Sequence, residues 1–284
     1  MAYLELHRGP THSLLLLPFW ALIFSWILAK ILREPRGWRP LYGVTTMGIG
    51  LHVAGDLITS YGTMIFWPLS DVRPGLGSTF IIDPWFSGII VAGLVASIWF
   101  RTSKIPSIVA STMLCVYVGF GWLQKEKALE LGAEYARSRN LATAKVAAHP
   151  RAVSPYNWTV FVSDERNHHF AHINISRTAP RPYTEGDGFF ARLDAAFQPP
   201  ASARWETRSR YGDDPVGKEA WDSPALGFMR WFADQPAFDG KTANPECFWF
   251  LDLRFANPGR DWVPFRFGAC RDALGLPWRA QERG

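Results

Sequence analysis

Cysteine and charge are both scarce in this chain. It has 3 cysteines among 284 residues, and none forms a Cys-x-x-Cys pair, which excludes a disulfide-rich small scaffold and a cysteine-based zinc knuckle. Charged residues make up 19% of the sequence, against 48% hydrophobic and 15% aromatic residues, and this balance excludes an intrinsically disordered chain. The net charge of +5 would permit a nucleic-acid partner, but the distribution of the charge indicates a different environment.

Most of the charged residues lie in the second part of the chain. Residues 13–123 are largely apolar, whereas residues 124–284 are polar throughout. The apolar part contains four runs joined by short polar loops: Ser13–Leu32, a run within Leu41–Phe66, Trp85–Phe100 and Ile105–Leu123. A helix of about 20 residues just crosses the hydrocarbon core of a bilayer. One such run would also suit a buried helix of a soluble protein, but four in succession predict an α-helical membrane domain of four spans.

The basic residues of the loops predict how these spans are oriented. The first loop carries Lys30, Arg33, Arg36 and Arg39, the third carries Arg101 and Lys104, and the second has Asp71 and Asp83 against Arg73. Loops rich in Lys and Arg stay in the cytoplasm. We therefore expect loops one and three to be cytoplasmic. The N-terminus, the second loop and the C-terminal domain then lie outside the cytoplasmic (inner) membrane of a bacterium.

Polar residues within the second run form a regular pattern. His52, Asp56, Thr59 and Thr63 are spaced i, i+4, i+7 and i+11, so on one helix they would share a single stripe. Polar groups inside a membrane are costly unless they are paired or functional. An i, i+4 His/Asp pair suits two ligands of one divalent metal ion, and it equally suits a hydrogen bond that holds two helices together. The spacing alone leaves both interpretations open.

Two further segments bring similar residues to the same side of the membrane. His7, Arg8 and His12 lie at the outer end of the first run, and Asp83 opens the third run on that side. Asp83 before Pro84 also reads as an ordinary helix N-cap. Because the second run points outward, three segments converge on one face. This convergence predicts a divalent-metal site with His7, His12, His52 and Asp56 as ligands.

These motifs resemble the YdjM-like membrane-bound metal-dependent hydrolases. The motifs are His-Arg-Gly-x-Thr-His-Ser from His7, His-x-x-x-Asp-x-x-Thr-x-x-Gly-Thr from His52, and Ile-Asp-Pro-Trp from Ile82. The resemblance covers about residues 7–125 and implies a LexA-binding, inner-membrane-associated hydrolase. A LexA-type protein partner follows from the family name alone, and only the short basic loops would be available to it in the cytoplasm.

The chain departs from the family at its N-terminus. Members open with a further helix that bears a Thr-His pair and an acidic Pro-Asp-x-Asp turn, whereas here the first motif begins at His7. We expect the missing helix to be encoded upstream of Met1. The alternative is that this protein has lost part of its metal site.

Together, the residues and the resemblance predict metal-assisted hydrolysis at the outer face of the membrane. A divalent ion, zinc or manganese in the first place, would activate water, and Arg8 would neutralise an anionic group such as a phosphoester. Thr59 or Thr63 would orient the ligands, and Asp83 would serve as a base or an extra ligand. A lipid or another extracytoplasmic molecule is the expected substrate, without direct binding of nucleic acid. The alternative is a non-enzymatic membrane scaffold or sensor whose outer domain binds a partner and whose His/Asp cluster is structural.

The polar part of the chain predicts an α+β domain with an antiparallel sheet. We divide the chain into a membrane domain at 1–124, a connecting helix at 125–145 and an extracytoplasmic domain at 146–284. Gln124–Asn140 is rich in helix formers and continues the fourth span. A short helix is expected within Pro215–Asp234, and the part shows no P-loop, Gly-x-Ser-x-Gly or dinucleotide pattern. Aromatic and β-branched runs predict strands at Thr159–Ser163, Phe170–Ser176, Cys247–Phe255 and Trp262–Cys270.

Three histidines, His172 within the second of these runs and His168 and His169 just before it, invite a metal interpretation. On a strand, His168 and His172 would share one face and His169 would point to the other. No acidic partner stands at a fixed spacing from them. We therefore interpret them as solvated strand histidines rather than as a second metal site.

The last two strand-like runs place two cysteines opposite each other. A hairpin that turns at Pro258–Gly259 pairs residues whose numbers sum to about 517, and Cys247 and Cys270 meet this condition. Outside the cytoplasm a disulfide is chemically allowed, so we expect either a cross-strand bridge or two adjacent thiols. Cys115, within the fourth run, should remain a free thiol.

Overall fold

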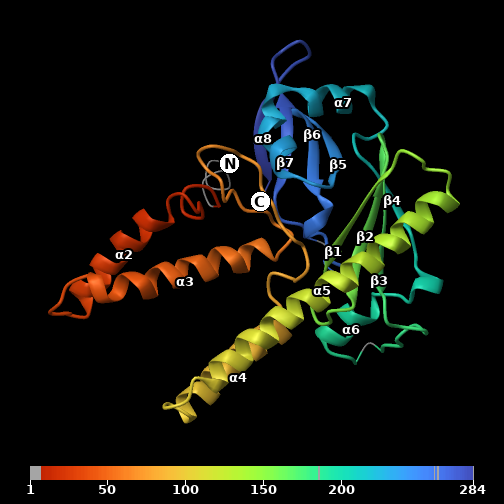
Figure 1. The fold of residues 1–284 in the computed structure, drawn as a ribbon. Helices are drawn as coiled ribbons and strands as arrows, with labels where there is room; N and C mark the ends of the chain where they lie inside the picture. The colour runs from red at the N-terminus through yellow and green to blue at the C-terminus, as the bar shows by residue number, and fades with distance from the viewer. Residues whose placement is uncertain (1–7, 185, 259, 261, 284) are drawn as a thin grey trace. The chain divides into compact units, whose positions relative to one another are not determined.

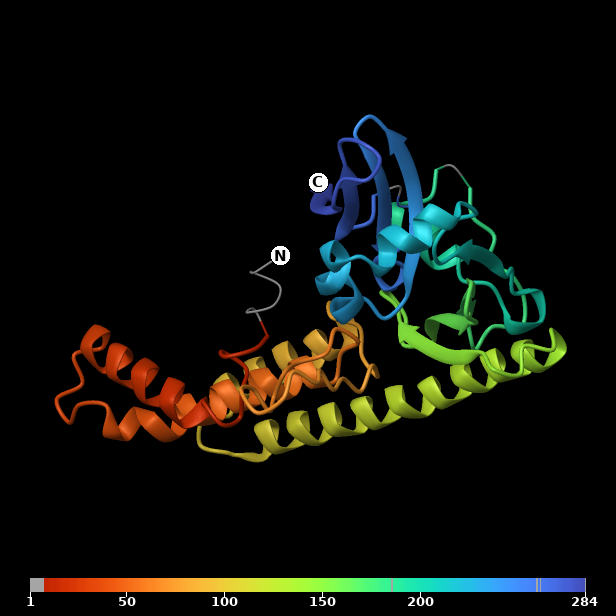
Figure 2. The ribbon, with the colours of Figure 1, turned by 90° about the horizontal axis from the view of Figure 1, so that it is seen from above.

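The computed structural model describes residues 8–184, 186–258, 260 and 262–283. The chain divides into two compact units, Met1–Leu123 and Gln124–Gly284. The first unit is helical and the second contains the strands (Figures 1 and 2). The prediction of a helical region followed by a sheet-rich domain is confirmed.

Helices make up most of the first unit. Each of them has a proline within its first two positions, where the missing N–H group has no helical partner to lose. Helices α2 and α3 pack against each other as a hairpin. The helices are α2 (Leu17–Ile31), α3 (Arg39–Leu57), α4 (Pro84–Trp99) and the first part of α5 (Ile105–Ser138).

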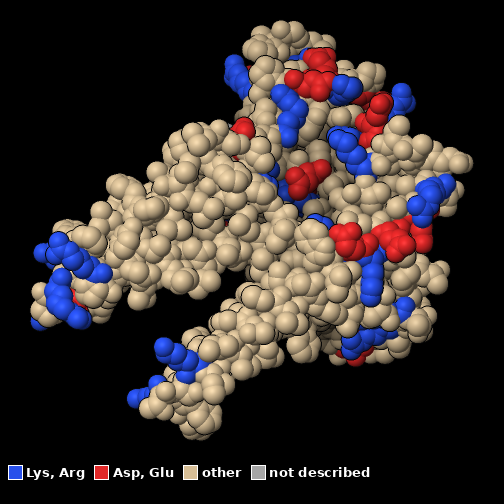
Figure 3. All heavy atoms as spheres, in the orientation of Figure 1, with Lys and Arg blue, Asp and Glu red and all other residues tan. Residues whose placement is uncertain are grey.

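The surface of these helices is apolar. In the described part of the chain, α5 is the helix long and apolar enough to cross a membrane, by length and composition, while α2 and α4 are shorter apolar helices. Large side chains such as Trp26, Leu51, Val91 and Ile98 are exposed on the unit's surface. Lys and Arg gather at the far ends of the helical hairpins, with other residues between them (Figure 3). Four spans and their orientation remain a prediction.

Two four-stranded antiparallel sheets form the second unit, where the sequence predicts one. In each sheet every strand pairs with the next strand along the chain. The strands of the first sheet are β1 (Lys145–Pro150), β2 (Asn157–Ser163), β3 (Asn167–Asn174) and β4 (Glu206–Ser209). Those of the second are β5 (Pro236–Ala243), β6 (Glu246–Asp252), β7 (Arg266–Arg271) and β8 (Arg279–Arg283). Helix α6 (Phe189–Ala195) lies between β3 and β4, and helices α7 (Pro215–Asp222) and α8 (Gly227–Phe232) lie between β4 and β5.

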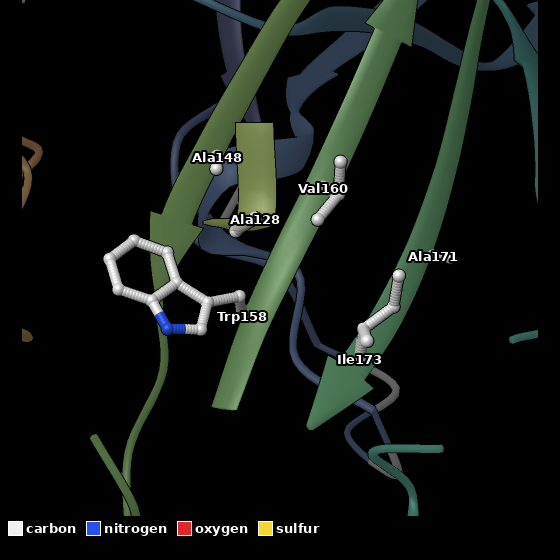
Figure 4. Packing of buried hydrophobic residues seen from close by; sticks show 6 residues of the cluster. All are labelled: Ala128, Ala148, Trp158, Val160, Ala171 and Ile173. Atoms are coloured by element: carbon white, nitrogen blue, oxygen red, sulfur yellow. The ribbon is translucent and has the colours of Figure 1, made fainter. Parts of the chain in front are cut away.

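The first sheet is covered on both faces. On one face the polar end of α5 contributes Ala128 to a cluster with Ala148, Trp158, Val160, Ala171 and Ile173 of the sheet (Figure 4). A Cβ atom at Gly132 of α5 would lie 2.5 Å from a methyl carbon of Val146, so glycine lets the helix approach the sheet. The opposite face buries Phe161 and Phe170 against residues of the second sheet, including Leu251. Alternate residues of β2 therefore serve two different cores.

The histidines of β3 are held by hydrogen bonds, so the interpretation as solvated strand residues is wrong for His168. Its ring is 1% exposed, and its nitrogens lie 2.7 Å from Ser163 Oγ and 2.7 Å from the carbonyl oxygen of Pro236. Burial lowers the pKa of His168 to about 4 and that of His172 to about 3. None of the three belongs to a group of three metal-type ligands among the described residues.

The second sheet carries the disulfide that the numbering predicts. Cys247 and Cys270 are directly paired on β6 and β7, their Cα atoms lie 4.1 Å apart, and they form a disulfide. Cys115 is free and exposed on α5. The register arithmetic is confirmed because the hairpin keeps the same pairing from Glu246 to Phe250.

Removal of the disulfide should destabilise the second unit. We expect Cys247→Ser combined with Cys270→Ser to lower the free energy of unfolding by about 2–4 kcal/mol, because the open loop regains chain entropy when it unfolds. Denaturant unfolding of the full chain in detergent measures this loss, and Cys115→Ser is the matched control, with no loss expected. Three reactive thiols in the denatured, unreduced protein would contradict the bridge.

Candidate metal centre

The N-terminal segment is tied to the loop that follows α3. The Met64 N–H donates to the carbonyl oxygen of Arg8 at 2.9 Å, and the Leu14 N–H donates to that of Ile65 at 3.0 Å. The buried hydroxyl of Ser13 donates to the carbonyl oxygen of Trp67 at 2.5 Å. These bonds fix residues 8–14 beside residues 64–67 of the loop that follows α3.

Helix α3 ends earlier than the sequence predicts. Its last residue is Leu57, so Thr59 and Thr63 lie beyond it, and the prediction that they continue the stripe of His52 and Asp56 on one helix is wrong. The carbonyl oxygens that a longer helix would use accept instead from the returning segment 76–79: Leu57 from Leu76, Ile58 from Ser78 and Thr79, and Thr59 from Gly77. Gly62, at φ +85°, then turns the chain through a conformation that side chains rarely adopt.

Three of the predicted ligands come together. His12 Nε2 lies 3.1 Å from His52 Nε2 and 3.1 Å from Asp56 Oδ2. One ligand atom from each residue lies within 4.8 Å of the others. His52 and Asp56 are one turn apart on α3, whereas His12 arrives from the N-terminal segment. His12 is buried, Asp56 is half-buried and His52 is exposed, so the cluster is open on the side of His52.

The two separations measured from His12 are compatible with a shared ion. Two ligand atoms that each lie about 2.0–2.2 Å from one metal ion are roughly 2.8–3.6 Å apart at octahedral or tetrahedral angles. Both 3.1 Å contacts of His12 fall in this range. Thr11 Oγ1 lies 2.8 Å from His12 Nδ1, and if it accepts the Nδ1 proton, Nε2 carries the lone pair that would bind a metal ion. The three side chains could therefore hold a metal ion.

Arg8 contacts the cluster through Asp56. Its Nη2 is 3.2 Å from Asp56 Oδ1, and its guanidinium lies 4.2 Å from the centre of the Tyr61 ring. Only 6% of Arg8 is exposed, and its Nη1 is buried without a hydrogen-bond partner among the residues that the structure describes. Arg8 thus pairs with the Asp56 carboxylate and has one buried donor that no described residue uses.

The other predicted residues have different surroundings. Thr59 Oγ1 donates to the backbone carbonyl of Asp56 at 2.8 Å, and the buried Thr63 Oγ1 has no hydrogen-bond partner in the described part of the chain. Asp83 caps α4: Oδ1 accepts from the N–H groups of Trp85 and Phe86, and Oδ2 accepts from the hydroxyl of Tyr117 at 2.8 Å. His7 lies outside the described residues.

Two contacts of this region were not predicted from the sequence. Tyr61, under Arg8, and Tyr117, on Asp83, join segments far apart in the chain. No spacing rule relates such pairs. Thr11, by contrast, stands next to His12 and could have been singled out as its partner.

Comparison with known proteins bears on the same region. The family described as YdjM inner membrane protein matches residues 1–128. The chain is also 30% identical over 119 residues to the uncharacterized protein YfhP of Bacillus subtilis (strain 168), an alignment that covers 42% of this chain and 35% of that protein. No solved structure matches the chain. The resemblance read from the motifs is confirmed over the segment that carries the cluster.

A substitution at Gly62 tests whether the turn after α3 stabilises the region of the site. A Cβ atom there would lie 2.8 Å from the carbonyl oxygen of Arg73, so we expect Gly62→Ala to lower the free energy of unfolding by about 1–3 kcal/mol. Gly48→Ala, within α3 and with no atom within 4 Å of the added carbon, is the control and should cause no loss. Thermal unfolding in detergent compares the two variants. Equal stability of both would show that the turn does not constrain the site.

Proposed function

We propose that this chain is a metal-dependent hydrolase of the bacterial cytoplasmic membrane, because the YdjM inner membrane protein family matches residues 1–128 and His12, His52 and Asp56 lie together in that segment. The observation that carries the proposal is the convergence of three ligand-type side chains from two segments of the chain. A divalent ion held there would act as a Lewis acid and would lower the pKa of water toward neutrality.

Each residue around the cluster has a distinct task in this proposal. His12, His52 and Asp56 hold the ion, and the contact from Thr11 keeps the His12 ring in position. Arg8 holds Asp56 through Nη2 and offers the neighbouring Nη1 to an anionic oxygen of the substrate. A phosphoester, in a lipid or another extracytoplasmic molecule, matches a cation beside a metal ion.

Asp83 has a different task. Both of its carboxylate oxygens already accept hydrogen bonds, from the first turn of α4 and from Tyr117 of α5. We therefore assign Asp83 to joining α4 and α5 rather than to proton transfer. Thr63, whose buried hydroxyl has no described partner, is the better candidate for orienting a ligand or water.

Metal content tests the proposal. The full-length protein, purified without chelator, should carry about one divalent ion per chain or more, measured by mass spectrometry of the elements. His52→Ala and Asp56→Ala should each lose most of this metal and any hydrolysis of a model phosphodiester such as bis(4-nitrophenyl) phosphate. His169→Ala, on β3 of the second unit, is the control and should retain both.

One result would favour the alternative. A well-folded wild-type protein without bound metal, even after incubation with zinc or manganese, would contradict the hydrolase. It would support a membrane scaffold or sensor in which the cluster only joins the N-terminal segment to α3.

We further propose four spans with the cluster and the second unit on the outer side of the membrane. The support is the apolar surface of the helices and the basic residues at the hairpin ends. Single cysteines test this in a Cys115→Ser background. Ser70→Cys, between α3 and α4, should react with a membrane-impermeant maleimide in intact cells, and Ser103→Cys, between α4 and α5, only after permeabilisation. The reverse pattern would overturn the orientation.

A further inference from the structure

The second unit contains a cavity that has no part in the metal centre. Its volume is about 460 Å³, within the range of small-molecule sites. Strands β3 and β4 of the first sheet and β5 and β6 of the second contribute to its wall. The chain after β6 adds Leu253, Ala256, Asn257, Pro258, Arg260 and Val263. Apolar side chains form much of this wall, among them Phe170, Leu251, Leu253 and Val263.

Two hydrogen-bonding side chains of the wall share one organiser, the buried Arg151. Its Nε donates to Thr159 Oγ1 at 2.6 Å, and Thr159 Oγ1 in turn lies 2.8 Å from His172 Nδ1. Its Nη1 lies 3.3 Å from Asn257 Oδ1. His172 and Asn257 both line the cavity, and Arg151 is 4% exposed. One guanidinium therefore fixes the orientation of both side chains.

These bonds determine which groups face the cavity. Because Thr159 Oγ1 already accepts from Arg151, its own proton is available to His172 Nδ1, and the remaining proton of the neutral ring is then on Nε2. His172 Nε2 has no hydrogen-bond partner among the described residues. The Asn257 amide, whose oxygen faces Arg151, has its NH2 group left to donate. Two neutral donors are thus available at one side of the wall.

Charge around the cavity is positive in balance. Arg208 and Arg260 line it together with Glu206 and Asp239. Asp239 is neutralised, because Arg266 Nε donates to it at 2.6 Å. The buried Arg151 stands behind the two donors and has its Nη2 without a hydrogen-bond partner in the part of the chain that the structure describes. An acceptor group with negative charge satisfies these donors best.

We propose that this cavity binds an amphipathic organic anion. The carboxylate or phosphate group lies against His172 and Asn257, and its apolar body packs on Phe170, Leu251 and Val263. The site is separate from the metal centre, because every residue of its wall belongs to the second unit. The proposal gives this unit a ligand of its own.

Calorimetric titration of the full-length protein in detergent tests the site. The probes are 4-phenylbutyrate, phenyl phosphate and the neutral 4-phenylbutanamide, each corrected for its heat with empty micelles. We expect at least one anion to bind about tenfold or more tightly than the amide. A preference for 4-phenylbutyrate or for phenyl phosphate then identifies the head group as carboxylate or phosphate. Equal binding of anions and amide would overturn the proposal.

A matched pair of variants locates the binding. His172→Phe keeps a ring beside Phe170 and Phe197 but removes the donor, so the anion should bind about tenfold or more weakly. His169→Phe, on the opposite face of the same strand, should bind as the wild type does. Arg208 is exposed on β4, so Arg208→Gln leaves the core unchanged. We expect it to weaken binding of the anion and to leave binding of the amide unchanged. Unchanged anion binding in both His172→Phe and Arg208→Gln would place the anion elsewhere and overturn the assignment.

Discussion

The carboxylate of Asp56 is the group on which the first unit depends. It lies on a helix whose neighbours are apolar, where an unpaired charge costs several kcal/mol. One oxygen faces Arg8 and the other faces His12, and both partners come from the same short segment before α2. The backbone bonds from Met64 and Leu14 hold this segment, so the loop after α3 is also part of the arrangement. Pairing one charge thus fixes two stretches of irregular chain.

The part of the site that the sequence predicts is the part set by local geometry. His52 and Asp56 share a helix face because residues four apart always do. His12 of the N-terminal motif lies beside them, as convergence on one membrane face predicts. The prediction that Thr59 and Thr63 lie on the same helix is wrong, because α3 ends where its last carbonyl groups accept hydrogen bonds from residues 76–79. Propensity along the helix carries no information about a segment that returns some twenty residues later.

The strands also divide into those that the sequence pattern predicts and those that it does not. Strands with aromatic and β-branched residues, such as β2 and β6, are visible from their pattern, and the pairing of Cys247 with Cys270 follows from counting along one hairpin. Strand β1, with the sequence KVAAHP, and the exposed β4 and β8 lack this pattern. The sequence pattern does not predict the burial of His168 either, because the carbonyl group of Pro236 that it contacts belongs to the other sheet.

The order of strands has a consequence for how this protein is made. Each sheet is a meander, in which every strand pairs with the one synthesised before it. The first sheet is complete in the chain at Ser209, before the first residue of β5 has left the ribosome. Pairing can therefore proceed from the N-terminal side as the polypeptide emerges, with short loop closures and without waiting for distant partners. The second sheet, whose disulfide joins residues 247 and 270, is the last to emerge, and its strands can pair in the same sequential way.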